Sequence, residues 1–117
     1  MAHHDSSFSM DSTSSLFFLH SGDHPKLVLV SHPLISPNYN TWGRAMLMAL
    51  NAKHKLGFVD GSISQPSPED PSVGVWSRCN SMDTSWLFNA ASKEITASFL
   101  YLDNAQAVWA DLHNRFH

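Results

Sequence analysis

Apolar side chains recur at helical spacing in four stretches of the chain, separated by connections rich in proline, glycine or serine. The first stretch follows Pro37, and its apolar residues stand three or four positions apart, on one face of a helix. They are Tyr39, Trp42, Met46 and Leu50. Asn38 or Asn40 is expected to cap this helix, and Gly57 to close it after Lys55 as a left-handed C-cap. Further apolar positions widen the stripe, which predicts burial over more than half of the circumference.

Three more helices are predicted downstream. The stretch 73–90 carries apolar positions three or four residues apart, and it contains two tryptophans that indicate a thick helix–helix interface. These positions are Trp76, Cys79, Met82, Trp86, Leu87 and Ala90. A short helix is expected over 92–100, with Ser92 as N-cap. The last begins at Asp103, which with Gln106 resembles a capping box. Its stripe consists of Ala105, Val108, Trp109, Leu112 and Phe116.

The region before the first helix lacks this periodicity. Residues 1–15 are serine-rich and poor in bulky apolar groups, which predicts a disordered tail. Residues 16–19 form an apolar island, interpreted as an arm that lies on the core of the domain rather than as a docking segment for a partner. Residues 26–31 predict an extended segment with no sheet to join. The domains are therefore a tail (1–15), an extended arm (16–37) and a helical domain (38–117), and the fold class is all-α with about four helices.

Composition narrows the class of protein. The chain has 117 residues, room for one small domain, and a net charge of -3, so it has no basic surplus for a phosphate backbone. The single cysteine, Cys79, excludes an intrachain disulfide and fits a reducing compartment. No apolar run approaches the length of a membrane helix, and the start does not resemble a signal peptide. A cytoplasmic location is expected, with the nucleus as the alternative.

Candidate chemistry is sparse. No serine elbow or phosphate loop occurs, and Cys79 on an apolar helical face is expected to be an inert thiol. The pairs His20–His24 and His113–His117 have i, i+4 spacing, but each is interpreted as solvated rather than metal-binding. We therefore expect no catalytic residue, cofactor, metal, membrane contact or small-molecule substrate. The basic residues are dispersed, so direct nucleic-acid binding by this segment is not expected either.

A family resemblance rests on three motifs. They are N-Y-x-x-W at residues 38–42, W-x-R-x-N at residues 76–80, and W-x-x-L in A-V-W-A-D-L-H-N-R-F at residues 107–116. With the lead-in L-V-L-V-S-H-P-L at 27–34, the chain from about residue 20 to 117 resembles the N-terminal gag region of plant Copia-type LTR retrotransposons.

The resemblance implies a capsid-like helical domain whose copies assemble around element RNA, and no enzyme activity. The predicted partners are therefore other gag copies. The family-motif and core residues are Asn38, Tyr39, Trp42, Met46, Trp76, Trp86, Leu87, Trp109 and Leu112, and the candidate self-association residues are Val108, Leu112 and Phe116. The alternative hypothesis is a host-adopted helical module for protein interaction.

The end of the chain carries a separate expectation. The sequence stops at His117, before the later capsid helices and the zinc knuckle of the family pattern. This predicts a domain truncated at its C-terminus. The far end of the last apolar stripe would then have nothing in the chain to pack on, and the last helix would be the least protected.

Overall fold

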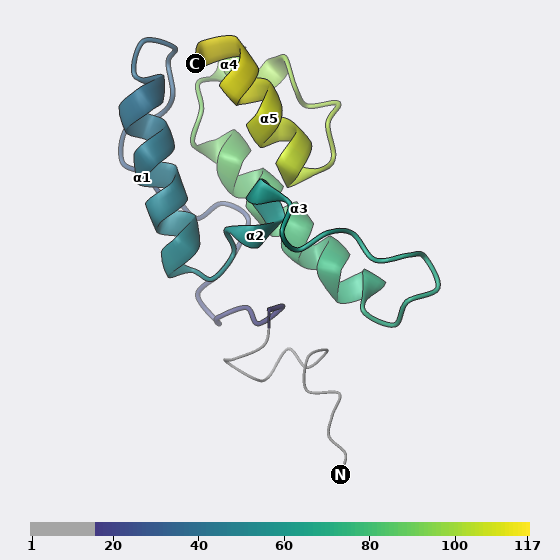
Figure 1. Ribbon diagram of the computed structural model, residues 1–117. Helices are drawn as coiled ribbons and strands as arrows, with labels where there is room; N and C mark the ends of the chain where they lie inside the picture. Colours follow the sequence, from purple (N-terminus) through teal and green to yellow (C-terminus); the bar gives the residue numbers. More distant parts are fainter. Residues whose placement is uncertain (1–15) are drawn as a thin grey trace.

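Helices account for the regular structure of residues 16–117, the part of the chain that the computed structural model describes (Figure 1). The all-α prediction is confirmed, while the predicted tail at residues 1–15 lies outside the described residues. The fifth helix, beyond the four expected, is a single turn after the first. The helices of the described region are α1 (Tyr39–Ala52), α2 (Gly57–Asp60), α3 (Val73–Asn89), α4 (Lys93–Ala97) and α5 (Ala105–Phe116).

α1 is buried along one face. Trp42, Met46 and Leu50 are at most 3% exposed, as their spacing predicted. The prediction that burial extends over more than half of the circumference is wrong, because Met48 is 62% exposed and its neighbours on the outer side face solvent.

Both ends of α1 differ from the prediction. Asn38 occupies the N-cap position, but its side chain makes no cap bond and turns back to the arm. Its Oδ1 accepts from the Ile35 N–H at 2.9 Å, and its Nδ2 donates to the Pro33 carbonyl at 3.0 Å. The helix ends at Ala52, and the left-handed residue after it is His54 (φ 58°) rather than Gly57, which begins α2.

Side-chain caps mark the starts of α4 and α5. Ser92 caps α4 as predicted, because its hydroxyl accepts from the Ile95 N–H. The predicted capping box at Asp103 is wrong: the N-cap of α5 is Asn104, whose side chain accepts from the Ala107 N–H at 3.1 Å. α3 matches its predicted range to within one residue, whereas α4 ends at Ala97.

The arrangement centres on α3 and α5, with α2 packed against both (Figure 1). α1 stands to one side, so it is not the element around which the others are organised. Its large side chains reach the rest of the core, and the Trp42 ring stacks on Trp109 of α5 with centroids 5.7 Å apart.

The arm joins no sheet within the described residues, as expected, but the predicted extended segment at 26–31 is only partly extended. Lys26 lies in a turn closed by the Leu27 N–H on the His24 carbonyl at 3.1 Å, and residues 30–32 form a bend. The arm's one ladder contact within the described chain is a parallel bridge between Leu34 and Ala91. The Leu34 N–H donates to the Ala90 carbonyl at 2.8 Å, and the Ser92 N–H donates to the Leu34 carbonyl at 2.9 Å. These bonds fasten the arm to the end of α3.

Buried apolar side chains form two clusters. The larger one joins α1, α3 and α5, and the smaller one lies under the start of the arm. The helical spacing of the four tryptophans predicts that they pack in one core, but Trp76 belongs to the smaller cluster and Trp109 is only half-buried. The smaller cluster contains Phe17, Phe58, Trp76 and Cys79, so the apolar island at residues 16–19 does lie on the domain's own core.

The end of α5 is packed, contrary to expectation. Phe116 is half-buried beside Tyr39, with ring centroids 6.3 Å apart. Arg115 lies over the Phe99 ring at 5.0 Å and donates to the Ser98 hydroxyl at 2.6 Å. The far end of the stripe therefore finds partners on α1 and near α4.

Gly61 at the end of α2 offers a first test of this packing. Its φ is +87°, and a Cβ there would lie 2.5 Å from Nε2 of Gln106 on α5. Gly61→Ala should therefore lower the free energy of unfolding by about 1–3 kcal/mol, measured by urea denaturation.

Gly74→Ala is the matched control. Gly74 lies in the first turn of α3 with nothing within 4 Å of an added Cβ. Alanine is the better helix former there, so this variant should be neutral or more stable by up to about 1 kcal/mol. Equal losses in both variants would contradict the close approach of α2 to α5.

Candidate interaction surface

Side-chain donors hold the arm by its main-chain carbonyls. The Trp86 indole N–H donates to the His24 carbonyl at 2.8 Å, and the Asn89 amide donates to the Pro25 carbonyl. At the start of the arm, the Lys55 ammonium donates to the Phe18 carbonyl. α3 and the α1–α2 connection therefore provide a seat that binds the main chain of the arm. The arm's own side chains add the Asp23–Lys53 ion pair at 2.6 Å and the buried Leu34.

Tryptophan indoles repeat this pattern elsewhere in the core. The Trp42 indole donates to the Ala90 carbonyl at 2.8 Å, the same oxygen that accepts from the arm at Leu34. The Trp76 indole donates to the Ile63 carbonyl at 2.9 Å. Each of these buried rings thus satisfies its N–H on a chain segment outside the helices.

A buried lysine and a buried aspartate lie under the arm. Lys55 is 1% exposed and Asp83 on α3 is 0% exposed, and neither oxygen of the Asp83 carboxyl has a hydrogen-bond partner. Burial raises the pKa of Asp83 to about 8, an effect that the positive charge of Lys55 opposes. The carboxyl is therefore held largely protonated at neutral pH.

Cys79 lies one turn before Asp83 on α3 and is completely buried. Its S–H lies 3.5 Å from the Phe17 carbonyl, and burial raises its pKa to about 11. A thiol of this kind is protonated and a poor nucleophile.

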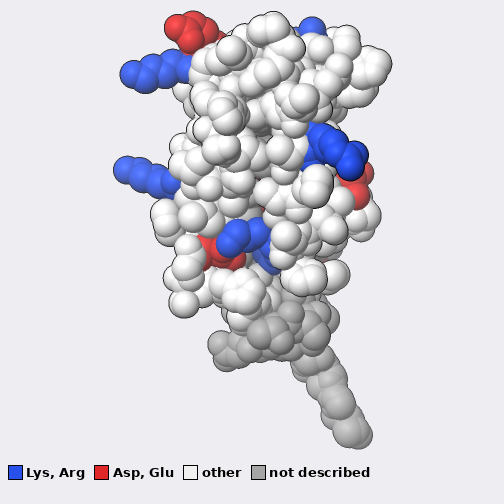
Figure 2. Space-filling view, turned by 90° about the vertical axis from the view of Figure 1, so that its left-hand side faces the viewer, with Lys and Arg blue, Asp and Glu red and all other residues white. Residues whose placement is uncertain are grey.

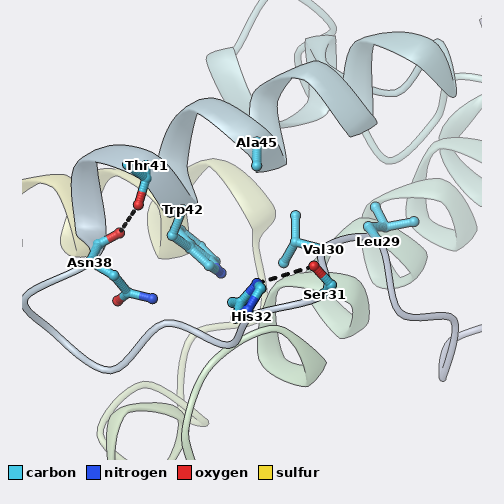
Figure 3. A pocket seen from close by; sticks show the side chains of 8 residues that line it. All are labelled: Leu29, Val30, Ser31, His32, Asn38, Thr41, Trp42 and Ala45. Carbon is cyan, nitrogen blue, oxygen red and sulfur yellow. Dashed lines mark hydrogen bonds between the residues drawn. The ribbon is translucent and has the colours of Figure 1, made fainter.

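An open hollow separates the middle of the arm from α1. Figure 3 shows it between residues 29–32 and the first turns of α1, with the Trp42 ring extending from the helix towards the arm. Its volume is about 640 Å³, and Ala45 lies on its helical side. The arm is thus open towards the first turns of α1 at residues 29–32, while its other side is held by the core.

A second hollow runs between α1 and α5. It has a volume of about 510 Å³ and lies beside the Tyr39, Met48 and Trp109 side chains. With Met48 largely exposed, this groove presents apolar surface to solvent. Figure 2 shows the side of the molecule on which α1 lies in Figure 1. That side is largely uncharged, and its lysine and arginine side chains are spaced apart.

The residues singled out from the sequence fall into three groups. Trp42, Met46, Trp86, Leu87 and Leu112 are buried in the larger cluster, and Tyr39 joins them at 7% exposure. Asn38 closes the turn before α1 through side-chain hydrogen bonds. Trp76 lies in the smaller cluster, and Trp109 lies at the groove between α1 and α5.

The candidate self-association residues need correction. Val108 is 0% exposed and Leu112 is 1% exposed, so both are inside the core and inaccessible to a partner. Phe116 is half-buried beside Tyr39. Of the three residues, Phe116 alone is accessible to a second copy.

Sequence reasoning missed Lys55 and Asp83. The spacing held a signal for one of them, because Asp83 lies four residues after Cys79 and three before Trp86, on the apolar stripe of α3. Nothing in the spacing indicated its neighbour Lys55, which comes from a different element.

Rings of both histidine pairs make contacts of their own. The rings of His113 and His117 lie side by side at the end of α5, with centroids 4.3 Å apart, while the His20 ring contacts Phe18. Among residues 16–117, no three His, Cys, Asp or Glu side chains gather closely enough to hold a metal ion. None of the helices in that range has the length and apolar character needed to cross a bilayer.

Part of the chain matches a known protein family. Residues 20–67 match the family model of the gag polypeptide of LTR copia-type elements. The match covers less than half of the chain, and this segment is similar to the copia-type gag family. The gag segment covers the arm from His20, all of α1 and α2, and part of the loop before α3. Neither a curated protein nor a solved structure matches the chain.

Proposed function

We propose that this chain is a non-enzymatic structural protein derived from a retrotransposon gag polyprotein, and that it acts as a capsid-region domain whose copies self-associate in the cytoplasm. The observation that carries the proposal is the gag match over residues 20–67, which includes most of the arm and α1, the helix that follows it. Gag proteins of this type are structural, and the most reactive side chain type present, the Cys79 thiol, is buried with a raised pKa.

The surface chemistry supports contacts between copies. Val28, Ile35 and Met48 are more than half exposed although they are large and apolar. Val28 and Ile35 belong to the arm and Met48 to α1, the elements covered by the gag match. These three side chains are therefore accessible to a second copy.

Size-exclusion chromatography with light scattering tests self-association. We expect a mass above the 13.0 kDa of one chain, rising with protein concentration. A mass of one chain at every concentration would contradict self-association. It would favour the alternative, a host-adopted helical module that binds other proteins.

Nucleic acid is not expected to be a direct partner of this segment. The net charge is -3, and the basic side chains in Figure 2 are scattered rather than gathered into a stripe. A filter-binding titration with single-stranded RNA should therefore show no binding at micromolar protein near physiological salt. Micromolar binding that weakens steeply as salt is raised would show that the charge distribution has been misjudged.

A further inference from the structure

We propose that residues 16–35, the part of the arm before the Ser36–Pro37 turn, are exchanged between two copies of this chain. Each exchanged segment then occupies the seat on α3 of the other copy. The inference rests on the proposed self-association and names the segment that carries it. The partner is a second copy, because the seat is already complementary to this arm.

The bonds that hold the arm can be made equally well to another chain. The three donors Lys55, Trp86 and Asn89 all bind main-chain carbonyls of the arm, at Phe18, His24 and Pro25. Phe17 adds an apolar anchor in the smaller cluster. None of these bonds depends on the connection between the arm and the α1 that follows it. An identical arm from a second copy restores the same set, which is why segment exchange is a low-cost route to dimers.

The connection itself is strained when the arm folds back on its own chain. Ser36, between the arm and α1, has a φ of +97°, a region that residues with a side chain rarely adopt. It also precedes Pro37, and a residue before proline strongly favours an extended backbone with negative φ. Opening the turn lets Ser36 become extended and relieves both restrictions. The strain therefore favours the exchanged form.

Opening the turn breaks few interactions. The hollow in Figure 3 separates part of residues 29–32 from the first turns of α1. The buried Val30 and Leu34 side chains regain their packing on the second copy. The bonds that close the turn are those of the Asn38 side chain to Ile35 and Pro33. The Leu34 bridge to Ala91 becomes intermolecular after exchange and is kept. Asn38 and Ser36 therefore act in opposite directions on the equilibrium.

Crosslinking between differently labelled chains detects the exchange. Pro25 and Asn89 are exposed, and they face each other across the arm seat. A Pro25→Cys chain, labelled with ¹⁵N, is mixed with an unlabelled Asn89→Cys chain, and a short bismaleimide is added. Exchange predicts a crosslinked dimer that contains one chain of each kind. The unaltered chain is the control for reaction at Cys79, which is buried.

The double variant Pro25→Cys/Asn89→Cys provides the opposite outcome. If the arm stays on its own chain, this variant is crosslinked within a single chain and the mixture yields no mixed dimer. That result would overturn the inference, because it shows an intact seat filled only from the same copy.

Hinge variants test the cause. Ser36→Gly removes the penalty for positive φ, so the dimer Kd should rise by about tenfold or more. Asn38→Ala removes two bonds that close the turn and should lower the Kd. Ser31→Gly, on the exposed arm outside the hinge, is the matched control and should leave the Kd unchanged.

The outcomes separate this inference from the proposed function. Self-association without mixed crosslinks, or with a Kd that Ser36→Gly does not change, leaves the proposed function standing and rejects arm exchange. A chain that is monomeric at every concentration rejects both.

Discussion

Trp86→Ala should lower the free energy of unfolding by about 3–5 kcal/mol, a large part of the stability of a small domain. The Trp86 ring is 0% exposed and lies in the larger cluster, so its loss leaves a cavity. The His24 carbonyl also loses its donor, and the arm loses one of its ties. Urea denaturation followed by far-UV circular dichroism gives the measurement.

Trp86→Phe is the matched control. It keeps much of the ring volume but has no N–H for the His24 carbonyl, so its loss should be clearly smaller than that of the alanine variant. An unchanged unfolding midpoint in Trp86→Ala would show that α3 does not form the interface to which its buried face is assigned.

Stability should fall as the pH rises from about 4 to about 8 because of Asp83. Burial raises the pKa of this carboxyl from 3.8 to about 8 in the folded chain. The folded state therefore keeps the proton over a range in which the unfolded state has released it. The free energy of unfolding should decrease through this window by up to about 1.4 kcal/mol per pH unit, and the loss should level off above the folded pKa.

Asp83→Asn isolates this contribution from the histidines that titrate in the same range. The amide carries no charge to desolvate, so the variant should lose most of the slope and be more stable than the unaltered chain at pH 8. Denaturation curves at pH 5 and pH 8 measure the difference. Lys55 and Asp23 are the other charges that act on this group, and neither is altered.

Asp103→Asn, at an exposed carboxyl, is the control and should keep the pH dependence of the unaltered chain. If Asp83→Asn instead shows the same slope as this control, Asp83 is ionised in the folded state and its burial beside Lys55 is misplaced.

Periodicity was sufficient to locate the long helices but not to locate their ends. The start of α5 shows why. Asp103 and Asn104 are adjacent and both suit an N-cap, so local propensity cannot choose between them. The choice is made by Asn80 of α3, which donates to the Asp103 carbonyl and accepts from the Ala105 N–H, both at 2.9 Å. A contact between residues so far apart in sequence is invisible to capping rules.

Only part of the candidate interaction surface could be predicted from the sequence. The apolar island at residues 16–19 could be assigned to the core, because its side chains are of a type that seeks burial. The seat on α3 could not be predicted from the sequence, because its side-chain donors bind main-chain carbonyls, and every residue has a main-chain carbonyl. Asn38 likewise looked like a helix cap, and only its distance to Pro33 and Ile35 reveals that it closes a turn.

Recognition through carbonyls places unequal evolutionary constraint on the two sides of the contact. The donors Trp86, Asn89 and Lys55 have to keep their reach and their N–H groups, whereas His24 and Pro25 contribute atoms that any residue supplies. A saturation mutagenesis library selected for folding should therefore be depleted at the donor positions and diverse at His24 and Pro25. Asp23, whose carboxylate pairs with the Lys53 ammonium at 2.6 Å, should stay constrained. Related chains could retain this architecture while the exposed positions of their arms drift apart in sequence.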